Sequence, residues 1–468
     1  MASATTTPPR IESPATVIDR VLAPFRYFAM QASAGGIVLL ACTIVALVWA
    51  NSPWGAGYDH LWEMPIAISA ARFSLRLTLH QFINDGLMAL FFLLVGLEIK
   101  REILVGHLSS ARLAALPIAG ALGGMIAPAL IYASIAAGGD AASGWGIPMA
   151  TDIAFALGML ALLAPGIAPS LRVFLAALAI ADDLGAILVI GIFYSSGLNM
   201  PAIYAAAAIF TLLILLNLAG VREWLPYMLV GLALWVAVLD SGVHATIAGV
   251  LLALTIPART RVDAEAFGAF GRSVLDRFER SSRASDRRGI LTNADQQAAI
   301  EALEDACEDA TPPLLRLEHG LHRWVTFFIM PLFALSNAGV TLSVNPVDAI
   351  RHPATLGVLL GLVIGKPLGI TLFAWVAIRT RLARFPAQGT WGQFFGVACL
   401  GGIGFTMSLF IAALAFRDEA LLESAKLGIL AGSAIAAAAG ALLLRRSAAA
   451  AREAATPAGM VSEAERQT

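Results

Sequence analysis

Two neighbouring aspartates, Asp182 and Asp183, stand in the middle of the apolar run from Val173 to Phe193. This run is long enough to cross a bilayer as a helix, where a carboxylate is costly and usually marks the path of an ion or a proton. Two adjacent carboxylates cannot easily both stay ionised unless a cation is near. The pair therefore predicts a site visited by a metal ion, a proton or a lysine; the alternative is a polar pair that only joins helices.

One basic residue, Lys366, is predicted at mid-membrane, near the centre of the apolar run 356–378. Adjacent helical residues point about 100° apart, so Asp182 and Asp183 can serve different partners. We expect Lys366 to pair with Asp182, which leaves Asp183 for the ion. A buried lysine can also release its proton and carry one itself. The alternative is a lysine whose side chain reaches out to water.

The stretch 144–152 predicts a broken helix, because it is rich in glycine and contains Pro148. It ends in Thr151 and Asp152, whose oxygens suit a hard cation. The same two residues could neutralise the helix termini at the break, or simply cap the helix that follows.

A second break is predicted inside the apolar run 394–416, where three glycines fall within four residues: Gly401, Gly402 and Gly404. Glycines that allow helices to pack closely are the alternative explanation. Interrupted spans at matching positions of two repeats point to a transporter binding site.

The chain that must position these residues has 468 residues, of which 58% are hydrophobic and 13% charged. That composition excludes a soluble domain of this size. Net charge is near zero and indicates no nucleic-acid partner, and the cysteines show no metal-binding spacing. We expect an all-α polytopic membrane protein with about twelve spans, near residues 34–51, 82–99, 113–136, 147–163, 173–193, 203–218, 225–239, 243–256, 325–340, 356–378, 394–416 and 425–444.

The distribution of Lys and Arg favours twelve spans with both termini cytoplasmic, because this arrangement places most of the basic residues inside. Merging the spans 225–239 and 243–256 into one would place the long Arg-rich loop and the N-terminal arginines on opposite sides of the membrane, against the rule that basic residues lie inside. The interrupted spans, the fourth and the eleventh, are each the middle one of three, in spans 3–5 and 10–12. These triplets start on opposite sides of the membrane, which predicts two inverted three-helix repeats.

Outside the spans the sequence predicts four segments. Residues 1–33 form a cytoplasmic N-terminal segment. Spans 1–8 occupy residues 34–257. The loop near 52–81, between spans 1 and 2, contains a stretch from Phe73 to His80 in which apolar and polar residues alternate, and this stretch predicts a small external β-hairpin. Residues 258–313 form a charged cytoplasmic loop with an amphipathic helix carrying Phe267, Phe270, Val274 and Phe278. Spans 9–12 (314–446) follow, and 447–468 is predicted to be a disordered cytoplasmic tail.

The motifs above are those of a known family. The stretches 91–98, 150–156, 182–186, 241–246, 365–369 and 402–408 carry the likeness, which covers nearly everything from Ala34 to Leu444. On these residues the chain closely resembles the NhaA family of bacterial Na⁺/H⁺ antiporters, transporters built from inverted repeats with broken helices.

The resemblance implies that Asp183 is the main sodium and proton site and that Asp182 pairs with Lys366, with Thr151 and Asp152 at the broken fourth span. It ties the pH response to charged groups at the cytoplasmic mouth, matched here by Glu98, Arg101, Glu102, Glu318 and His319, and to His244. Leu315 replaces a lysine common in the family and the loop 258–313 is longer than in familiar relatives, so the pH set-point stays open. Family members dimerise partly through the external hairpin.

The expected function is exchange of intracellular Na⁺ or Li⁺ for external H⁺ in the bacterial inner membrane, electrogenic and pH-regulated, for sodium and pH homeostasis. We expect no cofactor, membrane lipid as surroundings, and a homodimer. The main alternative is a sodium-coupled symporter of an organic solute. An intramembrane enzyme that uses Ser408 and His244 is a third possibility, but no catalytic motif in the sequence supports it. A channel is the fourth, and it would differ from an exchanger because its ion flux would be neither saturable nor dependent on a counter-ion.

Overall fold

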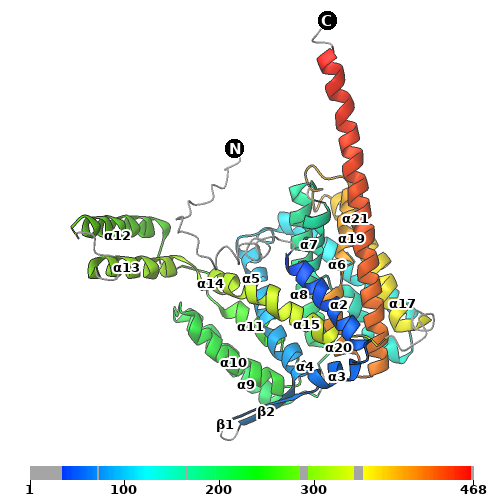
Figure 1. Cartoon of the computed structure of the whole chain (residues 1–468), viewed down its shortest axis with the longest axis horizontal. Helices are drawn as coiled ribbons and strands as arrows, with labels where there is room; N and C mark the ends of the chain where they lie inside the picture. Colours follow the sequence, from blue (N-terminus) through cyan, green and yellow to red (C-terminus); the bar gives the residue numbers. More distant parts are fainter. Residues whose placement is uncertain are drawn as a thin grey trace.

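The computed structural model describes residues 34–464 except 71–72, 165, 196, 261, 285–292 and 342–350, so the predicted N-terminal segment 1–33 lies outside the described residues. The described chain is mostly helical and forms one bundle, from which a helical arm and the C-terminal end of the last helix project (Figure 1). The protein is an all-α membrane protein with a small two-stranded sheet, as the sequence predicts.

Within the described residues, six helices are long and apolar enough to cross a membrane, and nine spans result if each bent helix pair counts as one. Two of the six continuous spans are built from consecutive helical segments. One joins α4 (Leu79–Gln81), η1 (Phe82–Leu87) and α5 (Met88–Leu104), and the other joins α17 (Pro353–Leu360), η5 (Gly361–Gly365) and α18 (Lys366–Arg379). The other four spans are single helices: α6 (Ala111–Ile135), α8 (Pro169–Phe193), α9 (Met200–Leu218) and α21 (Glu419–Ala464). The helices η1 and η5 are π-helical turns within their spans.

The remaining predicted spans also contain helices, but shorter ones. They are α2 (Ala34–Ala50) followed by α3 (Gly55–Trp62), α10 (Trp224–Asp240), α11 (Ile247–Thr255), and α14 (Pro313–Trp324) with η4 (Val325–Ile329) and α15 (Met330–Asn337). The chain turns by 117° between α2 and α3, so α3 leaves the line of the first span. Each of the twelve predicted spans is therefore helical, although length and composition alone support fewer crossings.

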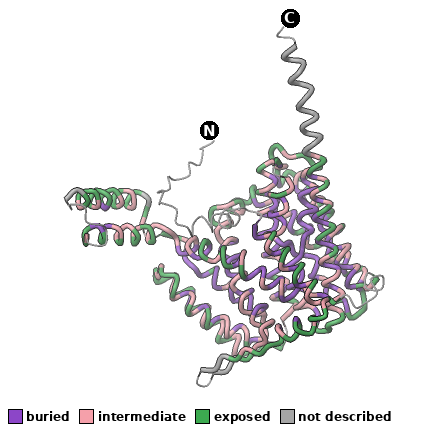
Figure 2. The backbone as a smooth tube through the Cα atoms, viewed as in Figure 1, coloured by how far each residue is buried: buried purple, intermediate pink, exposed green. Residues whose placement is uncertain are grey.

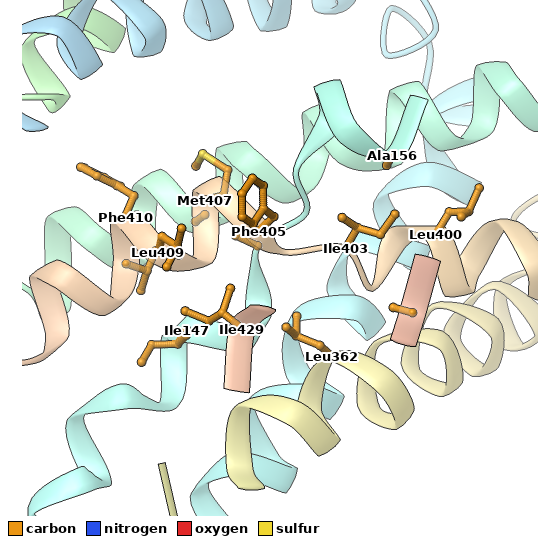
Figure 3. Close-up of a cluster of buried hydrophobic side chains, with 14 of the residues drawn as sticks. Ile147, Ala156, Leu362, Leu400, Ile403, Phe405, Met407, Leu409, Phe410 and Ile429 are labelled. Carbon is orange, nitrogen blue, oxygen red and sulfur yellow. The ribbon is translucent and has the colours of Figure 1, made fainter. Parts of the chain in front are cut away.

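Both predicted interruptions are present. The 3-10 helix η2 (Asp140–Met149) and α7 (Ile153–Leu163) are bent by 47°, and α19 (Trp391–Gly401) and α20 (Phe405–Ala415) by 42°. Figure 3 shows the non-helical segment around Ile403 among the buried apolar side chains of both broken spans. Two non-helical backbone segments thus meet inside the bundle, where protein rather than lipid can satisfy their polar groups.

Buried residues concentrate in the middle of the bundle, and α9 and α10 at its edge bury little (Figure 2). A large apolar cluster joins α5, α6, α8 and the C-terminal spans, and a smaller one joins α9, α10, α11 and α14 to α5. The exposed apolar faces of the outer helices suit contact with lipid, because the surrounding solvent in a membrane is hydrocarbon.

The predicted β-hairpin is confirmed, while its external placement stays a prediction. Strand β1 (Pro65–Ala70) pairs antiparallel with β2 (Phe73–Thr78), with Ile68 opposite Leu75. The predicted strand reached His80, but Thr78 ends it because its hydroxyl accepts from the Gln81 N–H and starts α4. The hairpin lies at the opposite end of the bundle from the projecting end of α21 (Figure 1).

The charged loop 258–313 holds two helices, not one. The predicted amphipathic helix is α12 (Ala264–Ala284), and the sequence analysis missed its partner α13 (Ala294–Ala310). The two pack side by side as an arm beside the bundle (Figure 1). Val274 of the predicted apolar face is buried, whereas Phe270 remains 46% exposed.

The predicted disordered tail needs correction, because the backbone of α21 is helical through Ala464. The segment 447–464 is rich in alanine, the residue with the highest helix propensity, and it continues a helix that the preceding span has already nucleated.

Candidate ion-binding site

The two broken spans cross at their interruptions, which brings several of the candidate residues together. The Asp152 N–H donates to the Ile403 carbonyl at 2.7 Å, and the Thr151 hydroxyl lies 2.9 Å from the Gly401 carbonyl. A Cβ atom on Gly402 would lie 2.5 Å from the Leu362 carbonyl oxygen, so η5 can pack this closely against the second break only with glycine there. Backbone groups freed by one break are thereby satisfied by the other.

Asp152 lies between the N-termini of two half-helices. Its Oδ1 accepts from the Phe155 N–H at 2.9 Å and caps α7, while its Oδ2 accepts from the N–H of Thr406 at 3.2 Å and from the Thr406 hydroxyl, at the start of α20. A negative group is stabilised at helix N-termini, where free N–H groups and the macrodipole concentrate positive charge. One buried carboxylate thus compensates both helix ends.

Lys366 lies at the carbonyl end of η2, whereas Asp152 lies at the N-termini of the half-helices. Its ammonium donates to the carbonyl of Met149, the last residue of η2, and lies 2.6 Å from Asp182 Oδ2. The Thr151 hydroxyl also lies 2.7 Å from Asp182 Oδ2. Both charged side chains are only 1% exposed, so each depends on the other for compensation.

Asp183 has a different environment from its neighbour. It is 1% exposed, and among the described residues neither of its carboxylate oxygens has a hydrogen-bond partner. The charged groups that act on it are Asp182, Asp152, Lys366 and Glu98. Because three of these four are carboxyl groups, the charged groups around Asp183 do not compensate its ionised form.

Comparisons with known proteins identify the family of the chain. A family profile described as "Na+/H+ antiporter 1" matches residues 26–444. The chain belongs to the NhaA family. It is similar to the "Na(+)/H(+) antiporter NhaA" of Oleidesulfovibrio alaskensis (51% identity over 90% of this chain and 93% of the relative), of Koribacter versatilis (50%, 91% and 91%) and of Acidithiobacillus ferrooxidans (50%, 89% and 96%).

Membership in the NhaA family makes the chain a transporter and not an enzyme, which removes the intramembrane-enzyme alternative. The side chains considered for it do not pair. Ser408 donates to the Ile147 carbonyl at 2.7 Å, and the half-buried His244 interacts with the Tyr194 backbone. Among the described residues, no group of three or more His, Cys, Asp and Glu is arranged to hold a metal ion.

The charged residues matched to the NhaA pH response divide into two groups. Arg101 forms an ion pair with the buried Glu318 at 2.5 Å and lies 3.7 Å from Glu102, and the charges of all three act on Glu98. His319 is exposed at the surface of α14, and His244 lies in the connection between α10 and α11. The structure therefore joins α5 to α14 through Arg101 and Glu318, and among the described residues neither histidine forms an ion pair with these two side chains.

The sequence analysis did not single out two positions that make polar contacts inside the bundle. Thr406 donates hydrogen bonds to the Asp152 carboxylate, but it is uncharged and the sequence analysis considered mainly charged residues. The Lys100 ammonium lies 2.7 Å from the Leu254 carbonyl and 3.4 Å from that of Ala253, at the C-terminal end of α11. A cation is favourable at a helix C-terminus, so Lys100 fixes α11 against α5.

Proposed function

We propose that this chain exchanges intracellular Na⁺ or Li⁺ for external H⁺ by alternating access, with Asp183 as the main ion and proton site. The observation that carries the proposal is the buried Asp183 carboxylate, which the described residues leave without a partner although Asp182 beside it is paired. A buried carboxylate of this kind is costly when it is ionised and uncompensated, so it binds either a proton or a metal cation, and one can replace the other. The names of the NhaA relatives support sodium as the cation.

The mechanism is competition at one site. Asp183 and Asp182 titrate as a coupled set, so protons and Na⁺ exclude each other. Thr151 and Asp152 hold the crossing, and Lys366 compensates Asp182 when it is ionised. Opening the site to one side of the membrane at a time then couples sodium export to proton entry.

The exchange is proposed to be electrogenic. If the deprotonated site takes one sodium ion but two protons, each cycle moves one net charge inward. A membrane potential contributes about 2.3 kcal/mol per charge for each 100 mV. An inside-negative potential would then accelerate sodium export, which supports sodium and pH homeostasis.

Regulation and assembly follow the same proposal. The contact between Arg101 and Glu318 joins two helices near Glu98, so a change of protonation there can alter the route to Asp183. His244 and His319 remain candidates for the pH response. The projecting β1–β2 hairpin supports a homodimer, and the excess of basic residues in the loops supports cytoplasmic termini in the bacterial inner membrane.

The test is the loss of a preformed pH gradient in everted membrane vesicles when NaCl, LiCl or KCl is added. Wild type should respond to Na⁺ and Li⁺, and Asp183→Asn should insert but give no response. Asp240→Asn, at the exposed end of α10, is the matched control and should behave as wild type. Full-rate exchange by Asp183→Asn would move the site elsewhere, and a response that required an organic solute would favour a symporter.

A further inference from the structure

A basic pocket lies away from Asp183, at the ends of three spans. It has a volume of about 720 Å³ and is lined by the N-terminal turns of α6 and α8 and by the connection after α18. Arg112, Arg381 and Arg384 supply its basic groups, and none of the described residues that line it is acidic. His107 also lines the pocket, but its ring lies 3.4 Å from the Glu102 carboxylate. The charge in this pocket is therefore uncompensated by its own walls.

The three guanidinium groups are available for a ligand. All three arginines are exposed, and within the described part of the chain none forms an ion pair. Arg381 has a φ of +63°, a left-handed conformation in which a glycine would be less strained.

The pocket is a fixed part of the bundle. Its inner wall contains the buried residues Leu116, Phe174 and Ala383. The Ser170 hydroxyl donates to the Ala387 carbonyl at 2.5 Å, which ties the connection after α18 to the start of α8. Arg381 and Arg384 therefore follow directly on α18, the helix that begins with Lys366, and the same connection is tied to α8, which carries Asp182.

The surroundings show which kind of anion fits. Below the arginines, α6 exposes Leu113, Ile118 and Leu122, and α18 exposes Leu368 and Leu372, each between 44% and 58%. In a membrane-spanning bundle these apolar stripes face acyl chains. The connections that hold the arginines fall on the cytoplasmic side of the predicted topology. A negative headgroup above two apolar stripes matches a phospholipid of the inner leaflet.

We propose that this pocket binds the phosphate-bearing headgroup of an anionic phospholipid, with its acyl chains along α6 and α18. Arginine recognises phosphate through two parallel hydrogen bonds, so three guanidinium groups can hold one phosphodiester firmly. The site is independent of the ion site, because the pocket contains none of the residues assigned to sodium or proton binding.

The experiment measures thermal unfolding of the full-length protein, purified and delipidated in a neutral detergent, as phospholipid is added. Dioleoylphosphatidylglycerol should raise the midpoint by about 5 °C at saturation, whereas dioleoylphosphatidylcholine should not. The triple variant Arg112→Gln, Arg381→Gln, Arg384→Gln should lose this rise. The control Arg272→Gln, Arg445→Gln, Arg446→Gln removes the same charge outside the pocket and should keep it.

Three results would overturn the proposal. They are an unchanged phosphatidylglycerol response in the triple pocket variant, an equal response to phosphatidylcholine, and a full response to inorganic phosphate or glycerol phosphate, which would indicate a soluble anion. If the triple variant does not fold, Arg384→Gln alone decides the matter: it should require roughly tenfold more phosphatidylglycerol for the same shift, and no change would count against the site.

Discussion

At the scale of single residues, the adjacent pair Asp182 and Asp183 has two environments. Asp182 shares one oxygen with Lys366 and Thr151, while neither oxygen of Asp183 has a partner among the described residues. The sequence predicted this division, because neighbours on a helix point in different directions and only one lysine was placed at mid-membrane. It could not predict Thr406 as the partner of Asp152, since 254 positions separate them and only the packed fold joins them.

Removing Lys366 should destabilise the protein strongly. Lys366→Ala leaves Asp182 buried without its cation, and breaking a buried pair in this way costs about 3–5 kcal/mol. The double variant Lys366→Ala, Asp182→Ala removes both charges and should recover much of that loss. Thermal unfolding of both single variants and the double variant forms the cycle. Strictly additive losses would show that the two side chains do not depend on each other.

Proton competition at Asp183 predicts a pH dependence. Acid fills the site with protons, so the apparent KM for Na⁺ should rise as pH falls, by about tenfold per pH unit for each competing proton. The maximum rate at saturating Na⁺ should change less. Initial exchange rates across a sodium series at several pH values would measure this. A KM independent of pH would exclude a shared site.

At the scale of elements, the two bent spans depend on each other at their ends. Asp152 caps both α7 and α20, while Lys366 and Thr151 lie at the carbonyl ends of η2 and α19. Glycine and proline content predicted both breaks. The sequence did not show how the breaks meet, because that depends on the close approach of spans far apart in the chain. It also missed α13, whose charged surface weakens the helical pattern.

Asp152 variants separate capping from charge. Asp152→Ala removes the acceptor at both helix starts and should cost about 0.5–2 kcal/mol for each cap lost. Asp152→Asn keeps an acceptor oxygen, so it should lose less stability. Unfolding midpoints in detergent compare the two. Equal losses would mean that the charge, not the hydrogen bond, stabilises the crossing.

Gly402→Ala tests the close approach of η5 to the second break. Its Cβ would meet the Leu362 carbonyl oxygen at 2.5 Å, so the two segments must move apart and we expect slower exchange. Gly36→Ala is the control, because its Cβ would find its nearest atom, the Ala154 carbonyl oxygen, at 3.9 Å. Exchange rates of the two variants at equal protein amounts decide the question. Unchanged exchange in Gly402→Ala would show that transport does not depend on the close contact between the second break and η5.

At the scale of the whole molecule, two apolar clusters share α5. The larger contains the broken spans, and the smaller is built from α9, α10, α11 and α14. Lys100 and Arg101, neighbours on α5, attach that helix to α11 and α14. Composition and the distribution of basic residues predicted a many-span bundle. They could not predict this division, because it depends on which apolar faces meet.

Shortening the β1–β2 hairpin should affect assembly more than transport. Replacing residues 65–78 by a short Gly-Ser linker removes a projecting element that holds none of the ion-site residues. We expect a smaller dimer fraction in detergent, measured by light scattering, with exchange in vesicles retained. A dimer fraction equal to wild type would remove the hairpin from the proposed interface.

The contact between Asp152 and Thr406 also has a consequence for biosynthesis. At about 5–20 residues per second, a ribosome needs roughly 10–50 s to make the chain between them. During that interval the first broken span stands in the membrane with its carboxylate unsatisfied at one end. The nascent protein is thus vulnerable to membrane proteases until its last spans insert, and a chain truncated before α20 becomes a natural target for quality control.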